Sequence, residues 1–386
     1  MSRIDELIER YCPDGVEYGE LGEVCTLARG VRVVRKNLAK DGGIPVFQNA
    51  LKPLGYHSES NRRADMSFVI CAGAAGQIGY SNTAFWAADD CYTVESAIFN
   101  DRFLYHLLLQ NQPKLIVQVR KASIPRLSRT AIERLRVPVP PMPVQEEIVR
   151  VLDSFAELEA ELEAELEARK AQYAFYRDKL IFHDARNTKL KPLGEIGSFS
   201  RGRRFTKNDY APTGIPAIHY ADIYTSLGTC TYKPMTHLSE SSRDRLRFAN
   251  PGDLVIACTG ETAEDIAKAT AWMGDSKIAV HDDCQIFSHN ENSLYIAYCF
   301  QTKDFAKQKL RYISEGKVTR IAESSLAKIK IPIPSQENQT RIARMLNEFE
   351  NLHSDVVSGL PAEIEARRKQ YAYYRDKLLT FKEKVS

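Results

Sequence analysis

The sequence predicts a mixed α/β protein with two similar globular domains, separated by two long helices that pack together as an antiparallel coiled coil. Three observations support this fold class. The 386-residue chain repeats itself along most of its length, each repeat opens with short β-branched runs divided by Gly- and Asn-rich turns, and each repeat closes with a long amphipathic helix. At about 100–200 residues per domain, this length agrees with two domains that each have their own core.

Direct comparison of the two halves reveals the internal repeat. Leu21-Gly-Glu-Val24 returns as Leu193-Gly-Glu-Ile196, and Glu167–Leu180 returns almost unchanged as Glu365–Leu378. The match is strongest at the ends of the halves and weakest in their interiors. A pseudo-twofold duplication is predicted, with an N-terminal helix and first domain in residues 1–143, a helical spacer in 144–187, a second domain in 188–338 and a second helical spacer in 339–386.

The domain segments are predicted to be rich in β-sheet. Ser67–Cys71 and Asp253–Cys258 are short apolar runs of the kind that form buried strands. Val137-Pro-Val-Pro140 and its counterpart Ile331-Pro-Ile-Pro334 predict a closing strand in each half, because proline removes ladder donors and stops further pairing. The Gly-rich segment Cys71–Gly79 lacks the spacing of a dinucleotide or phosphate loop, so a tight turn is the favoured interpretation.

Each half ends in a predicted long helix. Gln145–Phe182 contains neither Gly nor Pro, and its apolar residues recur at spacings of three, four or seven, which gives one stripe along about 57 Å of helix. The C-terminal tail has the same stripe, but Ser358-Gly-Leu-Pro361 predicts an interruption, with the helix restarting at Pro361. Because a lone helix of this length cannot bury its stripe on its own domain, we expect the two helices to pair.

The net charge of +3 is the sum of segments with opposite signs. Residues 16–143 and 188–334 carry +5 and +4, whereas the helical spacer 144–187 carries −5. Basic residues in both domains cluster beside glycines or turns, where loops can meet a phosphate backbone, although a solvated basic face is the simpler alternative for a single cluster. Recurrence at matched positions favours phosphate contact for Arg29, Arg32, Arg35, Lys36, Lys121, Arg126, Arg201, Arg203, Arg204, Lys207, Lys317 and Arg320.

Motifs for catalysis or metal binding are not found in the sequence. Asp89-Asp90-Cys91 and its counterpart Asp282-Asp283-Cys284 have no Lys or His in a nuclease or zinc spacing, so we interpret them as structural turns, with acid–base or metal chemistry as the alternative. The eight histidines are scattered, and neither a nucleophile elbow nor the base-holding segment of an amino-methyltransferase is present. These observations favour a binding protein.

The compartment is predicted from the cysteines and the apolar runs. The eight cysteines form no Cys-x-x-Cys pair, and several lie in apolar segments, which indicates buried free thiols in a reducing cytoplasm. The charged N-terminus lacks a signal-peptide pattern, and no run reaches the roughly 18 apolar residues of a membrane span. We therefore expect a cytoplasmic protein that does not contact a membrane.

The Leu-Gly-Glu openings, the Val137-Pro-Val-Pro-Pro-Met-Pro-Val-Gln-Glu-Glu-Ile148 run into a long helix and the two Gln-Tyr-Ala tails strongly resemble the specificity subunit of type I restriction-modification systems. The resemblance covers essentially the whole chain. It implies two target-recognition domains, each reading half of a split site in double-stranded DNA, and a helical spacer that docks two modification subunits. It also implies a restriction and translocase subunit, with S-adenosylmethionine, ATP and Mg in the partner subunits and no cofactor, metal or catalysis in this chain.

The resemblance also suggests roles for particular residues. Base reading is expected from polar loop residues, namely Gln48, Asn49, Gln77, His219, Tyr220 and Thr259. Subunit contacts are expected from the helical segments, namely Gln145, Ile148, Leu152, Phe155, Tyr173, Tyr176, Gln339, Ile342, Leu346, Phe349, Tyr371 and Tyr374. Because the interiors of the two domains diverge, the two half-sites are predicted to be unrelated in sequence.

Three tandem Glu-Leu-Glu-Ala tetrads, residues 157–168, distinguish the first spacer from the second. Such repeats look like length modules in this family. Four helical residues turn the chain by about 400° and lengthen it by about 6 Å, and one DNA base pair turns by about 34° and rises about 3.4 Å. Removing one tetrad is predicted to shorten the gap between the half-sites by about one base pair, with simple helix padding as the alternative.

Two other functions stay open on the sequence alone. The enzyme alternative is a self-sufficient DNA methyltransferase or nuclease with a degenerate site, which methyl transfer or cleavage by the purified chain would identify. The second alternative is a coiled-coil scaffold without DNA affinity, which a salt-dependent gel shift would distinguish from a DNA-binding subunit.

Overall fold

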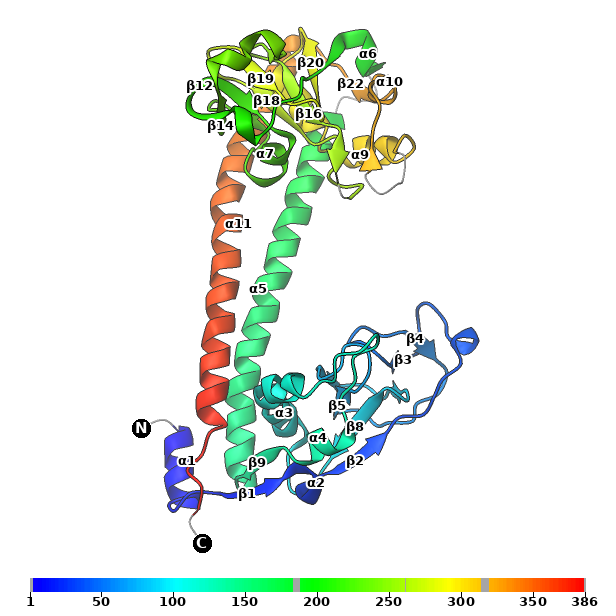
Figure 1. The fold of residues 1–386 in the computed structure, drawn as a ribbon, viewed down its shortest axis with the longest axis vertical. Coiled ribbons are helices and arrows are strands. Elements are labelled where there is room, and N and C mark those ends of the chain that lie inside the picture. Colours follow the sequence, from blue (N-terminus) through cyan, green and yellow to red (C-terminus); the bar gives the residue numbers. More distant parts are fainter. Residues whose placement is uncertain (1–2, 183–187, 261, 314–318, 385–386) are drawn as a thin grey trace. The chain divides into compact units, whose positions relative to one another are not determined.

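The computed structural model describes residues 3–182, 188–260, 262–313 and 319–384, which form two compact units. The first unit comprises Met1–Ala164 and Leu360–Ser386, and the second unit comprises Glu165–Gly359. Each unit therefore combines one sheet-rich domain with part of each long helix, as Figure 1 shows. The predicted spacer boundaries at 143 and 338 fall close to the starts of these helices, whereas the division between units falls within them.

The first unit begins with a short helix and then forms three small sheets. In chain order its elements are α1 (Arg3–Tyr11), β1 (Glu17–Glu20), α2 (Leu21–Val24), β2 (Thr26–Arg29), the 3-10 turn η1 (Arg35–Asn37), β3 (Ile44–Phe47), β4 (Gly55–His57), β5 (Met66–Ile70), β6 (Ile78–Ser81), β7 (Trp86–Ala87), β8 (Cys91–Glu95), α3 (Asp101–Val117), α4 (Arg129–Glu133), β9 (Arg136–Val139) and the start of α5 (Met142–Phe182). The main sheet has the antiparallel order β2-β8-β5-β6, and α3 packs on β5 and β6. The other sheets are β4-β3-β7 and the pair β1-β9.

The second unit repeats this plan with more strands. Its elements are β10 (Leu190–Pro192), α6 (Leu193–Ile196), β11 (Gly197–Arg201), η2 (Lys207–Asp209), β12 (Tyr210–Ile218), α7 (Tyr220–Thr225), β13 (Cys230–Thr231), β14 (Thr236–Leu238), η3 (Glu240–Arg245), β15 (Phe248–Ala249), β16 (Leu254–Ala257), β17 (Thr259–Gly260), β18 (Ala269–Trp272), β19 (Ile278–Val280), β20 (Cys284–His289), α8 (Ser293–Cys299), α9 (Lys303–Lys309), β21 (Thr319–Arg320), α10 (Glu323–Leu326), β22 (Lys330–Pro332) and the start of α11 (Gln336–Leu378). The sheets have the orders β11-β20-β16-β18-β13, β14-β12-β19-β15, β17-β21 and β10-β22.

Corresponding strands have corresponding partners in the two units. The order β2-β8-β5-β6 matches β11-β20-β16-β18, and the smaller sheets each contain one parallel pair, β3 with β7 and β12 with β19. The second unit adds β13 and β15 at the edges of its two larger sheets. The predicted mixed α/β fold with an internal repeat is confirmed, and the units differ where the sequence halves diverge.

The strands predicted from apolar runs are present and buried. All five residues of β5 and all four of β16 are buried, because both strands lie inside their sheets. The closing Pro-containing segments form β9 and β22, which pair antiparallel with β1 and β10. Each Leu-Gly-Glu segment forms the one-turn helix that directly follows β1 or β10.

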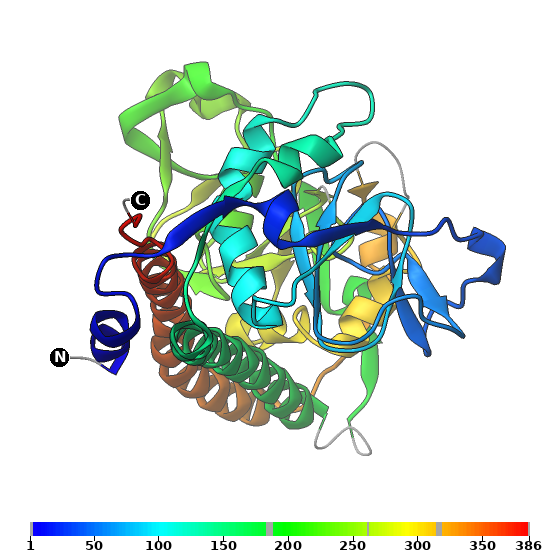
Figure 2. The same cartoon turned by 90° about the horizontal axis from the view of Figure 1, so that it is seen from below.

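The segment after α11 lies beside the start of β1 in the first unit, as Figure 2 shows from below. The Val16 amide donates to the Lys382 carbonyl oxygen over 2.9 Å, and the Lys384 amide donates to the Val16 carbonyl oxygen over 2.9 Å. The Tyr18 hydroxyl donates to the Phe381 carbonyl oxygen over 3.0 Å. These bonds anchor the segment after α11 to the strand β1 region.

The long helices pair antiparallel within each unit. In the first unit, Phe155 of α5 stacks on Tyr374 of α11, with ring centroids 5.3 Å apart. In the second unit, Tyr173 of α5 stacks on Phe349 of α11 at 5.5 Å. Residue numbers rise along α5 as they fall along α11, so the predicted antiparallel pairing is present in both units.

The predicted interruption before Pro361 is wrong, because α11 runs without a break from Gln336 to Leu378. A proline inside a helix removes one backbone hydrogen bond and crowds the preceding turn. On either side of the proline, Leu360 and Ile364 are buried, and this packing holds the helix through the local defect. The other long helix begins earlier than predicted, at Met142, because Pro143 is tolerated in a first helical turn.

Candidate DNA interface

A turn built on an Arg-Gly pair occupies the same place in both units. After β2, the Gly30 amide donates to the Cys91 carbonyl oxygen over 2.9 Å, and after β11, the Gly202 amide donates to the Cys284 carbonyl oxygen over 3.0 Å. A Cβ atom on either glycine would overlap backbone carbonyl oxygens of the facing turn, so both positions require glycine. The repeated Arg-Gly pair thus marks a close approach of two backbone segments.

The arginine before each glycine binds the acidic turn that faces it. Arg29 Nε donates to the Asp89 carbonyl oxygen over 2.9 Å, and Arg201 Nε donates to the Asp282 carbonyl oxygen over 2.7 Å. A guanidinium nitrogen of Arg201 also lies 3.7 Å from a carboxylate oxygen of Asp282. Both arginines are exposed, but their own domains hold them beside acidic residues, which makes them weaker phosphate ligands than the sequence suggested.

Two of the polar residues predicted to read bases contact the same acidic turns. Gln48 Nε2 donates to Asp90 Oδ2 over 3.3 Å in the first unit. Thr259 Oγ1 donates to Asp283 Oδ1 over 3.0 Å in the second unit. The Asp-Asp-Cys turns therefore link the main sheet to a polar loop in both units, which is the structural role inferred for them.

Asn49 and Gln77 lie at the glycine-rich hairpin turn between β5 and β6. The Ala74 amide donates to the Asn49 carbonyl oxygen over 2.9 Å, and the Gln77 side chain is exposed. Gly73 and Gly76 have φ values of +81° and +88°, which glycine adopts far more readily than other residues. The predicted tight turn is confirmed. It carries Gln77, and Asn49 in the loop after β3 lies against it.

A second basic group lies next to the Arg-Gly turn in each unit. Arg126 is exposed and bridges to Ala72, and Lys121 is exposed a few residues earlier. In the second unit, Arg320 lies opposite Thr259 where β21 pairs with β17, and it lines the same cavity as Arg201. Lys317, predicted to belong to this group, lies outside the described residues.

The remaining basic residues predicted to contact DNA lie on the segment that follows the Arg-Gly turn. The Val31 amide donates to the Ala87 carbonyl oxygen, and the Arg203 amide donates to the Val280 carbonyl oxygen, each over 2.9 Å, so the segment starts in the same way in both units. Their side chains are all exposed: Arg32, Arg35, Lys36, Arg203, Arg204 and Lys207. These cations fit phosphate contact better than Arg29 and Arg201 do.

His219 and Tyr220 belong to an aromatic cluster beside the acidic turn of the second unit. The His219 ring centroid lies 4.3 Å from that of His281 and 4.5 Å from that of Tyr220, and Phe205 meets His281 edge-on at 4.9 Å. Burial, with the nearby His281, lowers the pKa of His219, so this ring is neutral at neutral pH. His219 also caps α7 by accepting from the Ala221 amide over 3.3 Å. Base reading by His219 and Tyr220 stays a prediction.

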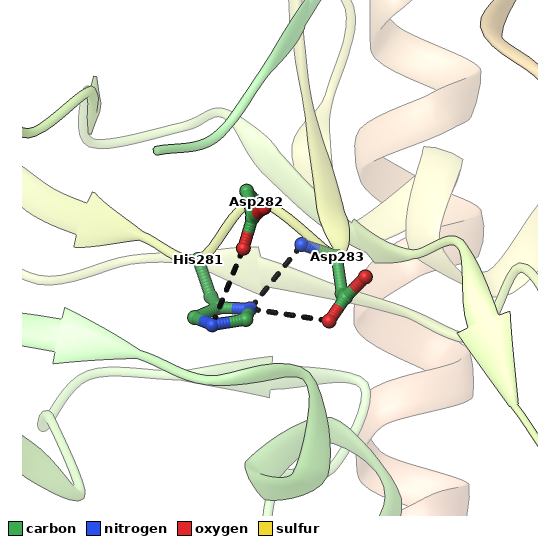
Figure 3. Close-up of side chains that lie close together, drawn as sticks. All are labelled: His281, Asp282 and Asp283. Carbon is green, nitrogen blue, oxygen red and sulfur yellow. Dashed lines mark hydrogen bonds and ion pairs between the residues drawn. The ribbon is translucent and has the colours of Figure 1, made fainter. Parts of the chain in front are cut away.

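His281, Asp282 and Asp283 form a compact cluster that the sequence spacing did not reveal (Figure 3). One ligand atom from each of these residues lies within 4.8 Å of the others. His281 Nδ1 accepts from the Asp283 amide over 3.2 Å, and His281 Nε2 lies 3.3 Å from Asp282 Oδ1. Both ring nitrogens are thus engaged within the turn itself, and we assign the cluster no metal.

A cavity of about 460 Å³ opens beside this turn in the second unit. Its lining includes Arg201, Thr259, Asp282, Gln285 and Arg320. Gln285 was missed by sequence reasoning, because one glutamine in a β-run gives no signal until its strand register is known. Burial raises the pKa of the neighbouring Cys258 thiol to about 12, so this thiol is protonated at neutral pH.

Half of the residues predicted to contact partner subunits are buried in their own units. Gln145 Oε1 accepts from the Asn100 amide over 2.7 Å and its Nε2 donates to the Pro140 carbonyl oxygen over 2.8 Å. Gln339 binds the Asn292 amide over 2.9 Å in the same way. Burial of the following side chains corrects the expectation that they form a surface for partners: Gln145, Ile148, Leu152, Gln339, Ile342 and Leu346.

The other predicted interface residues lie on the paired helices and are partly accessible. They are Phe155, Tyr173, Tyr176, Phe349, Tyr371 and Tyr374. Tyr176 and Phe349 line a groove of about 470 Å³ in the second unit. Sequence reasoning missed the two most exposed aromatic residues of the repeated tail, Phe175 and Tyr373, which are 57% and 62% exposed and occupy equivalent positions.

The two units share one plan, and each carries the basic Arg-Gly turn and part of the helix pair. This arrangement defines a duplicated two-domain protein. The chain belongs to the family of the type I restriction modification DNA specificity domain, which its sequence matches over residues 13–168 and 186–366.

Individual relatives agree with this assignment. The chain is 30% identical over 391 residues to a putative type I restriction enzyme specificity subunit of Haemophilus influenzae, covering 95% of this chain and 96% of that protein. It is 32% identical over 266 residues to a type I restriction enzyme specificity subunit of Escherichia coli, covering 66% and 65%. The fold is similar to that of a type I restriction-modification S subunit from M. genitalium, with a TM-score of 0.56, 14% identity and coverage of 95% and 96%.

None of the helices in the described part of the chain combines the length and the apolar character that crossing a bilayer requires.

Proposed function

We propose that this chain is the DNA sequence-specificity subunit of a type I restriction-modification enzyme, which recognises an asymmetric bipartite site in double-stranded DNA and acts in the cytoplasm. The observation that carries the proposal is the basic turn repeated at matched positions in two units whose surroundings differ. Repetition supplies two comparable DNA-binding surfaces, and divergence gives them different half-sites. Membership of the specificity-domain family supports the same function.

Catalysis in this proposal belongs to the partner subunits. Two modification subunits bind S-adenosylmethionine and transfer the methyl group, and restriction subunits use ATP and Mg for translocation and cleavage. The purified chain alone is then expected neither to methylate nor to cleave DNA. Methyl transfer or cleavage by the chain alone would favour the enzyme alternative.

Phosphate contact is tested by removing two charges from the segment after the Arg-Gly turn. Arg203→Ala with Arg204→Ala should weaken DNA binding for all sequences and lower the slope of log affinity against log salt by about 2, because each phosphate contact releases about 0.9 counterion. Binding is measured with the assembled complex over a series of salt concentrations.

Two control variants separate the positive charge of Arg203 and Arg204 from the shape of their guanidinium groups and from their position in the chain. Replacing both residues with lysine should restore binding, since a phosphate accepts a point charge. Removing two exposed arginines from α11, Arg341→Ala with Arg344→Ala, should leave the salt slope unchanged. An unchanged slope in the Arg203 and Arg204 double variant would refute the phosphate role.

The repeated helical tails provide one equivalent docking position for each of two modification subunits. Phe175 in the second unit and Tyr373 in the first are equivalent, exposed aromatic side chains on the paired helices. Large exposed aromatics of this kind mark protein–protein contact surfaces. Each position is proposed to anchor one modification subunit through an apolar segment of that partner.

Removing these anchors should change the stoichiometry stepwise. Phe175→Ala alone is expected to leave one modification subunit per chain in native mass spectrometry, and Phe175→Ala with Tyr373→Ala none at the same concentration. Tyr232→Ala removes an equally exposed aromatic, at 65%, from the domain part of the second unit, and should retain both partners. Two retained partners in the double variant would contradict this docking site.

A further inference from the structure

Two pairs of strands contribute to the cavity beside the acidic turn of the second unit. Gln285 in β20 lies directly opposite Arg201 at the end of β11, and Thr259 lies opposite Arg320 where β17 pairs with β21. Directly opposed side chains of neighbouring strands have Cβ atoms about 4.5–5.5 Å apart. The strand register therefore gathers two guanidinium groups and one amide around one cavity.

Gln285 is a polar residue at a buried position of β20. Its side chain is only 7% exposed, and its amide oxygen, Oε1, is buried without a hydrogen-bond partner among the described residues. Buried polar atoms are normally hydrogen-bonded, because an unpaired one carries its full desolvation cost. Gln285 lines the cavity, so a turn of its side chain as a ligand enters would bring this unpaired acceptor to a donor group of the ligand.

The chemistry around the cavity mixes donors with acceptors. Arg201 and Arg320 supply donors, whereas Gln285 and the carboxylates of Asp282, Asp283 and Glu323 supply acceptors. A phosphate offers only acceptors and would be repelled by the three carboxylates. The edge of a base pair in the major groove offers both donors and acceptors.

The acidic turn also orients the arginine. Arg201 Nε donates to the Asp282 carbonyl oxygen, which leaves the terminal nitrogens to face outward or toward the carboxylate 3.7 Å away. An arginine held at its Nε is pre-ordered, so less side-chain freedom is lost when the fork binds a base.

The first unit has the same arrangement of an arginine held by an acidic turn, with a different residue in place of Gln285. Arg29 is held by the Asp89 carbonyl oxygen as Arg201 is held by that of Asp282, but the residue opposite Arg29 in the strand pair is Tyr92. The arrangement is constant, and the residue next to the arginine varies between units. This is the pattern expected of a site that reads different bases in two half-sites.

We propose that Arg201 and Gln285 read one G·C base pair of the second half-site. Arg201 binds O6 and N7 of guanine through its fork, and Gln285 Oε1 accepts from N4 of the paired cytosine, while the segment that carries Arg203 and Arg204 holds phosphates. The inference rests on the proposed function, since it names the residues that give the second unit its sequence preference.

The test uses the chain assembled with its modification subunits, and measures the methylated motif and the affinity for DNA duplexes that carry each base at each half-site position. Arg201→Lys keeps the charge but loses the fork, so it should lower discrimination at one G·C pair of the second half-site by about tenfold or more. Gln285→Met, which keeps the side-chain length, should relax the same pair. The first half-site should be unchanged in both variants.

Matched control variants show whether a changed motif comes from the proposed contacts, from any arginine-to-lysine exchange or from loss of folding. Arg243→Lys makes the same exchange at an arginine of similar exposure in η3, 56% against 60% for Arg201, and should leave both half-sites unchanged. Tyr92→Phe in the first unit should affect only the first half-site. Unchanged melting temperatures identify the variants that remain folded, and Arg201→Lys tests the proposal even where Gln285→Met does not fold.

The possible outcomes distinguish failure of the proposed function from failure of the base-reading assignment. A wild-type complex that methylates no bipartite motif would overturn the proposed function itself. A wild-type bipartite motif that Arg201→Lys leaves unchanged would overturn only the base-reading assignment. A melting temperature raised by Mg²⁺ in the wild-type chain, but not in Asp283→Asn, would assign the cavity to a cation and also overturn it.

Discussion

Leu152→Ala is expected to lower the free energy of unfolding by about 2–5 kcal/mol, as is Leu346→Ala at the equivalent position of the second unit. Both leucines lie on long helices, are 0% exposed and belong to the domain cores. Truncation removes buried apolar contacts and leaves a cavity that the packed helix start cannot fill. Urea unfolding followed by circular dichroism measures the loss.

The same helices provide controls at matched spacing. Leu158 and Leu352 lie six residues after Leu152 and Leu346, but they are 43% and 70% exposed. Alanine at these exposed positions should change the free energy of unfolding by no more than about 0.5 kcal/mol. An equal loss at Leu158 and Leu152 would contradict the assignment of one to the core and the other to the surface.

Deletion of one tetrad, residues 161–164, is expected to shorten the non-specific gap of the DNA site by about one base pair. Four helical residues contribute about 6 Å and a net turn of about 40°, and the turn is close to the twist of one base pair. In the first unit, Arg368 forms ion pairs with Glu159 and Glu163. After the deletion, Glu167 takes the place of Glu163, so both ion pairs of Arg368 are kept, and the α5 residues that follow the deletion move by about one turn along α11.

A variant of constant length isolates the effect of length. Glu161→Gln with Glu163→Gln removes two charges but no residue, and should leave the gap unchanged. The gap is read from the methylated motif in cells that express each variant. If the deletion left the gap unchanged, the tetrads would be helix padding, which is the alternative considered for them.

The duplicated fold could be predicted because its signals are periodic. The apolar stripe of α5 and the β-branched runs of β5 and β16 depend on local spacing, which one sequence displays directly. The continuity of α11 through Pro361 could not be predicted in this way. Pro361 is a local helix breaker, but burial of Leu360 and Ile364 by residues distant in sequence overrides that preference.

The candidate site was predicted in its composition but not in its detail. Basic residues beside glycines correctly indicated a repeated surface feature. Their division into turn-bound arginines, such as Arg201, and outward cations, such as Arg203, depends on the acidic turn that the sheet places opposite them. Gln145 resembled an interface residue because it recurs, yet its three hydrogen bonds fasten the helix to its own domain.

Single-molecule methylation sequencing of genomic DNA from cells with and without this chain determines whether the chain sets the sequence that is methylated. The proposed function predicts a motif that depends on the chain and consists of two unrelated half-sites of a few base pairs, with centres about one helical turn apart and a non-specific gap between them. A palindromic motif, or the absence of any chain-dependent motif in cells that also express the modification subunits, would contradict it.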